Sequence, residues 1–157
     1  MTGLDELVRG FLSQKRIVVA GVSRNSREAA NVIFRKLDGA GYDVVPVNPR
    51  TDQAEGRPCY PDLAAVPDKV DAVVIATPPS AADTLVAQCA DLGIRWVWMH
   101  RSFGQGSVSQ TAVDWCRAHD IHVIAGGCPM MFCKPVDVPH RCMKWLLGVT
   151  GGLPTPW

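Results

Sequence analysis

Short apolar runs alternate with amphipathic segments along most of the chain. The apolar runs are rich in Val and Ile, and each is followed by a polar or glycine-containing break, which is typical of strands covered on both faces. We expect five such strands, at residues 17–20, 43–47, 71–76, 95–99 and 121–125. Helical spacing in most of the segments between them predicts crossover helices, which would make the strands of the sheet parallel.

The helical segments begin at residues that favour helix N-termini. Ser23 and Asn25 are suitable N-caps for the helix after the first strand, and Ser80 for the helix after the third. The polar, proline-rich stretch 52–67 is expected to be a loop with one helical turn near residues 63–66. The remaining helices are expected at residues 4–13, 107–119 and 137–147. The chain after the last helix, residues 151–154, is expected to be a frayed end.

This alternation predicts an α/β fold. We expect a doubly wound sheet of about five parallel strands flanked by helices, with an N-terminal helix and a C-terminal helical tail. The 157 residues suit a single domain, with a core at 14–131 and an extension at 132–157. In such sheets ligands bind at the carboxyl ends of the strands, where the strand order reverses. The residues that follow each strand are therefore the candidates for a binding site.

Composition narrows the classes of function. A net charge of +1 leaves no basic excess with which to neutralise a nucleic-acid backbone. The acidic N-terminus does not resemble a secretory signal, and no apolar run approaches the ~20 residues that span a bilayer. We expect a cytoplasmic protein with no nucleic-acid or membrane partner. Its six cysteines lack a CxxC pair and are expected to be free thiols.

Two strand ends carry the residues most suited to a phosphate ligand. The first strand runs into Gly21-Val22-Ser23-Arg24, a close turn before a helix, where free N–H groups and the helix dipole favour an anion. This turn lacks the second and third glycines of the GxGxxG fingerprint. The second strand ends in Asn48-Pro49-Arg50, without the acidic residue that binds a ribose diol. NAD is therefore disfavoured, whereas NADP or another ribose-phosphate ligand stays open.

Five segments around the strand ends occur together in a specific order. They are Ile17–Arg24, Pro46–Arg50, Ala76–Pro79, Trp96–His100 and Gly127–Pro129. As a set they resemble the stand-alone CoA-binding proteins, a Rossmann-type family similar to the N-terminal CoA-binding domain of the succinyl-CoA synthetase α subunit. The resemblance covers roughly Gln14 to Met131. It implies a Rossmann-like fold that binds coenzyme A or an acyl-CoA.

The resemblance also implies a binding mode, carried over by position. Its residues are Gly21, Val22, Ser23 and Arg24 at the pyrophosphate, Asn48, Pro49 and Arg50 at the adenosine with Arg50 near the 3′-phosphate, Thr77, Pro78 and Pro79 along the adenine or pantetheine, and His100 and Arg101 near the pantetheine arm. Many family members have Trp-x-Gln-x-Gly after the fourth strand, where this chain reads Trp98-Met-His-Arg-Ser-Phe-Gly104. His100 and Arg101 are therefore the local departure from the family pattern.

The resemblance implies CoA binding but does not imply a catalytic activity. The synthetase α subunit has a second domain with a phosphorylated His, for which this chain lacks the length, so the resemblance implies CoA binding rather than ligase chemistry. His100 and Cys128 are the candidates for a reactive group. No metal site is expected, because the Cys and His residues of the tail lack the spacing of a zinc site.

Two other classes of function stay open. Arg50 would also suit an NADP-binding oxidoreductase. A regulatory or scaffold module with a vestigial nucleotide site is the third hypothesis, and a homodimer is open for any of the three.

Overall fold

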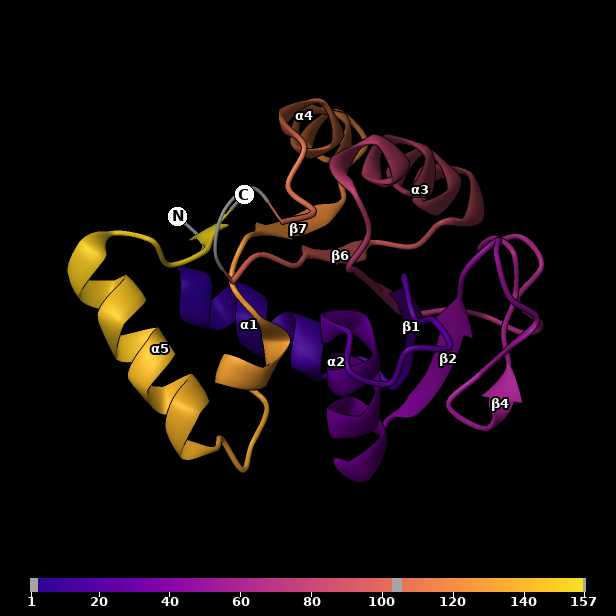
Figure 1. Cartoon of the computed structure of the whole chain (residues 1–157). Helices are drawn as coiled ribbons and strands as arrows, with labels where there is room; N and C mark the ends of the chain where they lie inside the picture. The colour runs from indigo at the N-terminus through magenta and orange to yellow at the C-terminus, as the bar shows by residue number, and fades with distance from the viewer. Residues whose placement is uncertain (1–2, 103–105, 157) are drawn as a thin grey trace.

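The computed structural model describes residues 3–102 and 106–156, and its centre is a six-stranded sheet in the order β2-β1-β5-β6-β7-β8 (Figure 1). The first five strands in this order are parallel, and β8 joins the edge antiparallel to β7. Their bounds are β1 Arg16–Ala20, β2 Asp43–Val47, β5 Ala72–Ile75, β6 Trp96–Met99, β7 His122–Ala125 and β8 Thr155–Pro156. The five predicted parallel strands are confirmed to within one residue at each end.

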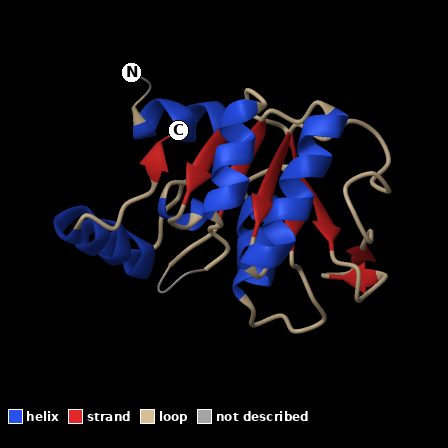
Figure 2. Cartoon of the chain, turned by 90° about the horizontal axis from the view of Figure 1, so that it is seen from above, coloured by secondary structure: helices blue, strands red, loops and turns tan. Residues whose placement is uncertain are grey.

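Helices cover both faces of the sheet (Figures 1 and 2). One face is covered by α3 and α4 and the other by α1 and α2, while α5 lies at the periphery on the side of α1 and α2 and packs against the short turn Pro129–Met131. The bounds are α1 Leu4–Leu12, α2 Ala29–Gly39, α3 Pro79–Leu92, α4 Gln110–Ala118 and α5 Val138–Thr150. The doubly wound, Rossmann-like α/β fold predicted from the sequence is therefore confirmed.

The two hydrophobic cores follow from the alternation of side chains along each strand. In β1, Val18 belongs to the core beneath α3 and α4, while Ile17 and Val19 belong to the core on the α1 and α2 side. All three side chains are fully buried. Burial of each stabilises the fold by roughly 1.5–3 kcal/mol. This explains why the strand runs are apolar at every position rather than at every second one.

The first turns of α2 and α3 differ from the prediction. Helix α2 begins at Ala29 with Glu28 as its N-cap, so the prediction that Ser23 or Asn25 caps it is wrong. Ser23 Oγ instead accepts from the N–H of Asn25 at 3.0 Å, in a turn that precedes the helix. Short polar side chains form such local bonds as readily as helix caps. Helix α3 begins at Pro79 with Pro78 as its N-cap, so the prediction that Ser80 caps it is also wrong, because Pro79 is well suited to the first helical position.

The stretch 52–67 contains a small hairpin that the sequence analysis missed. It consists of β3 (Gln53–Ala54) and β4 (Arg57–Pro58), which pair antiparallel. The residues between them, Glu55 and Gly56, have φ of 51° and 72°. Two consecutive left-handed residues suit a two-residue hairpin turn. The single turn predicted near residues 63–66 is present, closed by one bond from the N–H of Val66 to the carbonyl of Leu63 at 3.3 Å.

The C-terminal part is a helix followed by an edge strand. Asp137 caps α5, since its Oδ1 accepts from the N–H of His140 at 2.9 Å, as expected for a helix at this position. The predicted frayed end is wrong, because the chain continues into β8, where Thr155 pairs with Ala125 of β7. Pro154 is buried on the way and packs against Gly127. Within the described ranges, no helix is long and apolar enough to cross a membrane.

Candidate functional site

A cavity of about 780 Å³ opens at the carboxyl ends of β1, β2 and β5. The chain leaves β1 for β2 on one side and later crosses to β5 on the other, so the strand order reverses at β1. The helices that follow β1 and β5 lie on opposite faces of the sheet (Figure 1). The cavity therefore lies at the topological switch point, where sheets of this kind bind ligands, and its volume is in the range of small-molecule sites.

Most of the site residues predicted from the sequence meet in this cavity. Its lining includes Gly21, Ser23, Arg24, Asn48, Pro49, Arg50, Thr77 and Pro78, which come from three separate strand ends. Val22, Pro79, His100 and Arg101 are not in the described lining. The Val22 side chain is fully buried in the core beside α2, and Pro79 is the first residue of α3, directly after the lining residue Pro78.

Gly21 sets how closely the turn after β1 can approach β5. Its φ is 106°, and a Cβ atom at this position would lie 2.3 Å from the carbonyl oxygen of Ala76. The N–H of Gly21 donates to the carbonyl of Val47 in β2 at 2.9 Å. Only glycine fits a backbone that is both left-handed and this close to another strand. The floor of the cavity is thus fixed by backbone contacts among three strands.

The turn after Gly21 is held by side chains on both sides. Asn48 Nδ2 donates to the carbonyl of Val22 at 3.0 Å, and Asn31 Oδ1 accepts from the N–H of Ser23 at 3.0 Å. The Ser23 hydroxyl donates to Glu28 Oε2 at 3.0 Å. The N–H groups of Val22 and Arg24 have no partner among the described residues. Backbone donors of this kind can bind an anion at the turn.

Two guanidinium groups stand at the rim of the cavity. Arg24 Nε donates to Thr51 Oγ1 at 3.1 Å, and its NH2 lies 3.9 Å from Asp52 Oδ1 in an exposed pair that contributes little. Arg50 is exposed, and its side chain has no ion-pair partner in the described part of the chain. Its backbone N–H donates to Asn48 Oδ1 at 2.9 Å, which fixes the loop after β2. Both groups can therefore turn toward a bound anion at small cost.

Helix α3 contributes a wall of the cavity that was not predicted from the sequence. Ala81, Thr84, Leu85 and Gln88 line the cavity at helical spacing, together with Ser80 and with Pro61 and Asp62 from the loop that follows the hairpin. Gln88 also accepts from the N–H of Leu63 at 3.0 Å and so holds this loop against the helix. The signal was present, because Thr84 and Gln88 are polar residues on the same helical face as Leu85.

The ends of β6 and β7 are packed differently. The N–H of Arg101 donates to the carbonyl of Gly127 at 2.9 Å, and its guanidinium lies against Gly126. Burial lowers the pKa of His100, as does nearby His140, so His100 is neutral at pH 7. His100 Nε2 lies 3.1 Å from Ser102 Oγ. The rest of the loop predicted after the fourth strand, residues 103–105, lies outside the described residues.

Neither a reactive thiolate nor a metal cluster marks this second region. Burial raises the pKa of the Cys128 thiol to about 11, so the thiol is protonated at neutral pH. No group of three or more His, Cys, Asp or Glu side chains within residues 3–102 and 106–156 is placed to hold a metal ion. The described cysteines are all free thiols, and Cys142 is the exposed one.

Comparison with known proteins gives a consistent family relationship. A family model described as a CoA binding domain matches residues 15–134. The ADP-forming acetate–CoA ligase II of Archaeoglobus fulgidus is 32% identical over 90 residues, which make up 56% of this chain and 13% of the ligase. The chain therefore matches only a small part of that relative's length.

Solved structures show the same fold. A hypothetical protein from Pyrococcus horikoshii OT3 superposes with a TM-score of 0.75 and 30% identity, over 83% of this chain and 90% of that chain. The dinucleotide forming acetyl-coenzyme A synthetase 1 of Ca. Korarchaeum cryptofilum, in complex with phosphate and ADP, gives a TM-score of 0.62 and 26% identity, over 80% of this chain and 28% of the synthetase.

Proposed function

The chain belongs to the CoA-binding domain family, and from this premise we propose that it binds coenzyme A or an acyl-CoA in the cavity at the ends of β1, β2 and β5. The observation that supports this most is the convergence of the predicted residues. Residues chosen from three strand ends, far apart in sequence, line one cavity at the switch point of the sheet. The proposal covers binding, without ligase chemistry of the chain's own.

The order of the strands matches the order of the chemical groups along CoA. Neighbouring strands β2, β1, β5 and β6 are followed within three residues by Arg50, Gly21, Thr77 and His100 respectively. These four strands span roughly 14 Å, from three spacings of about 4.8 Å. A CoA molecule laid along this edge would place its 3′-phosphate at β2, its pyrophosphate at β1 and its pantetheine arm over β5 toward β6. His100 and Arg101 would then lie beyond the cavity, along the path of the arm.

The pyrophosphate is the group that the β1 turn suits best. The free N–H groups of Val22 and Arg24 supply two backbone donors, and the Arg24 guanidinium supplies a charge nearby. Charge-assisted bonds of this kind are about twice as strong as neutral ones. The Glu28 carboxylate also lines the cavity, but it already accepts from the Ser23 hydroxyl. The turn therefore offers N–H donors to the ligand, while the Glu28 carboxylate is bound to the Ser23 hydroxyl.

The test is a titration of the purified protein with CoA, dephospho-CoA, acetyl-CoA and NADP, followed by calorimetry. We expect CoA to bind more tightly than dephospho-CoA, because Arg50 contacts the 3′-phosphate. Binding of NADP with no binding of CoA would overturn the proposal in favour of an oxidoreductase. Failure of all four to bind would favour a regulatory module with a vestigial site.

Two further predictions from the sequence accompany the proposal. The first is a cytoplasmic location, and the second, still open, is a homodimer. Light scattering at micromolar concentration distinguishes a dimer from a monomer, and comparison with and without CoA shows whether the ligand changes the assembly.

A further inference from the structure

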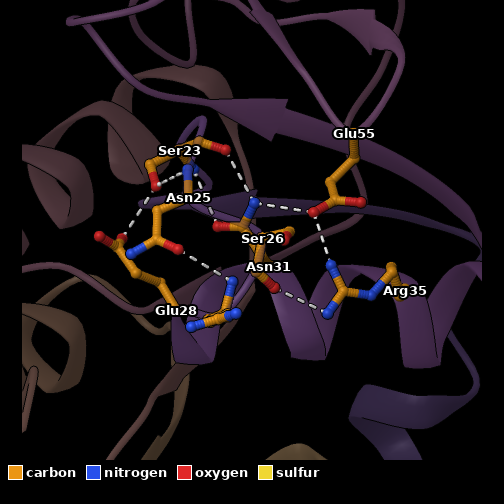
Figure 3. A network of polar contacts seen from close by, with 8 residues as sticks. Ser23, Asn25, Ser26, Glu28, Asn31, Arg35 and Glu55 are labelled. Atoms are coloured by element: carbon orange, nitrogen blue, oxygen red, sulfur yellow. Dashed lines mark hydrogen bonds and ion pairs between the residues drawn. The ribbon is translucent and has the colours of Figure 1, made fainter.

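We propose that Asn31 is a positioning residue that aims the backbone of the β1 turn at the ligand, and that Glu55 of the β3–β4 hairpin holds Asn31 in place. The inference rests on the proposed function, because the ligand at this turn is taken to be the CoA pyrophosphate. Figure 3 shows the network that connects the turn, α2 and the hairpin.

Asn31 forms a two-bond bridge to a single residue of the turn. Its Oδ1 accepts from the N–H of Ser23 at 3.0 Å, and its Nδ2 donates to the carbonyl of Ser23 at 2.8 Å (Figure 3). The side chain is only 1% exposed. A buried amide that lost these bonds would leave polar groups without hydrogen-bond partners away from water, which is unfavourable. The bridge is therefore strongly favoured in the folded protein.

The bridge fixes the direction of the neighbouring N–H groups. The carbonyl of Ser23 and the N–H of Arg24 belong to one planar trans peptide and point in opposite directions. Because the carbonyl points to Asn31, the N–H of Arg24 points away from it. The preceding peptide is held from both sides, since Asn31 binds the N–H of Ser23 while Asn48 Nδ2 binds the carbonyl of Val22. Asn31 thus determines where the free donor of Arg24 is aimed.

Glu55 completes the environment of Asn31. Its Oε1 accepts from Asn31 Nδ2 at 2.8 Å and from Arg35 NH1 at 2.7 Å. Arg35 NH2 in turn donates to the carbonyl of Ser26 at 2.8 Å, farther along the turn (Figure 3). With both Nδ2 hydrogens used, only one orientation of the Asn31 amide satisfies all its partners. The hairpin is therefore coupled to the turn through two side chains of α2.

The chain supplies a matched control for this coupling. The hairpin is tied to α2 a second time, by Arg57 NH2 and Asp38 Oδ1 at 2.6 Å. This pair joins the same two elements but has no bond to Asn31 or to the turn. Loss of Asp38 removes an ion pair between hairpin and helix and leaves the bridge to Ser23 intact. Loss of Glu55 removes its ion pair with Arg35 and also the acceptor of one Asn31 Nδ2 hydrogen.

The experiment compares Asn31→Ala, Asn31→Asp, Glu55→Ala and Asp38→Ala in two measurements. The first is NMR hydrogen exchange at the Ser23 amide in the ligand-free protein, and the second is calorimetry with CoA. We expect Ser23 protection to fall about tenfold in Asn31→Ala and severalfold in Glu55→Ala, and to be unchanged in Asp38→Ala. CoA affinity should fall in the same order. Asn31→Asp keeps an acceptor for the Ser23 N–H but loses both donations and faces the Glu55 carboxylate.

The outcomes separate this inference from the proposed function. If the Ser23 amide exchanges at the same rate in Glu55→Ala as in Asp38→Ala, the coupling between the hairpin and the β1 turn is refuted, whether or not CoA binds. If the exchange pattern is as expected but the unmutated protein does not bind CoA, the proposed function fails and the positioning of the turn stands. If Asn31→Asp remains folded and binds CoA as tightly as the unmutated protein, Asn31 has no role in aiming the turn. This variant serves as the test if Asn31→Ala does not fold.

Discussion

The carboxyl edge of the sheet has two regions built from the same kinds of element: an open region at β2, β1 and β5 that holds the cavity, and a closed region at β6 and β7 whose described residues pack against one another. At β2, β1 and β5 the chain diverges to opposite faces and leaves a cavity of about 780 Å³. At β6 and β7 the residues after the strands close on one another, with Arg101 against Gly126 and Pro154 against Gly127. A strand end with polar residues is thus not sufficient for a site. The reversal of strand order is what leaves the space.

Two glycines test this difference most strongly. Gly21 and Gly126 both follow a strand and have φ of 106° and 103°. A Cβ at Gly21 would lie 2.3 Å from the backbone oxygen of Ala76, whereas a Cβ at Gly126 would lie 3.0 Å from the end of the flexible Arg101 side chain. We expect Gly21→Ala to lower the free energy of unfolding by at least about 3 kcal/mol, and Gly126→Ala by about 1–2 kcal/mol.

Urea unfolding of both glycine variants measures these values. Gly21→Ala should also abolish CoA binding, while Gly126→Ala should retain it. Equal losses of stability would mean that the backbone contact between the β1 turn and β5 is not as close as described.

Arg50→Ala tests the charge at the open region. We expect CoA affinity to fall by about 1.5–3 kcal/mol, the range for a hydrogen bond to a charged group, and dephospho-CoA affinity to stay unchanged. Arg101→Ala, in the closed region, serves as the comparison and should weaken both ligands equally or not at all. Calorimetry gives all the constants, and equal binding of CoA and dephospho-CoA by the unmutated protein would remove the role of Arg50.

Thiol reactivity tests whether the closed region is accessible. Cys142 is exposed, whereas Cys128 is buried and burial raises its pKa to about 11. Alkylation with iodoacetamide at pH 7.5 should modify Cys142 at least about tenfold faster than Cys128, since only an accessible thiolate reacts. Peptide mass spectrometry over time gives both rates. Comparable rates would show that the β7 end opens in solution.

The pH dependence of stability tests the burial of His100 and has the smallest expected effect. Burial lowers the pKa of His100 below 6.5 in the folded state. As the pH falls below 6.5, the unfolded chain therefore binds more protons than the folded protein does. The stability contributed by neutral His100 is therefore present above about pH 6.5 and is lost below it. We expect the free energy of unfolding of His100→Asn to fall less between pH 7 and pH 5 than that of the unmutated protein. Parallel pH profiles would place His100 in solvent.

The sheet could be predicted because each parallel strand is a continuous apolar run, whereas the missed elements depend on tertiary contacts. The hairpin at 53–58 has two-residue strands, and its turn requires Glu55 in a left-handed conformation that Glu rarely adopts. The start of α2 could not be read from Ser23 and Asn25, because residues of these types cap turns and helices equally well.

The part of the candidate site at the strand ends could be predicted from the sequence, whereas the parts contributed by helices could not. Strand ends converge by topology, so Gly21, Asn48 and Thr77 could be placed together from the sequence. The polar residues Thr84 and Gln88 indicate a polar face on α3, but that this face lines the cavity depends on how the helix is rotated against the sheet. Asn31 occupies an ordinary helical position, and its role follows only from the approach of Ser23 and Glu55.

The most direct test of the central claim is a ¹⁵N-NMR titration of the unmutated protein with CoA. Binding in the open region predicts saturable shifts of the amides of Gly21, Ser23 and Arg24, together with Arg50, and smaller changes after β7. Saturable shifts confined to residues outside the β2–β1–β5 cavity, with the amides of residues 21–24 unmoved at saturation, would contradict the assignment of this cavity as the CoA site.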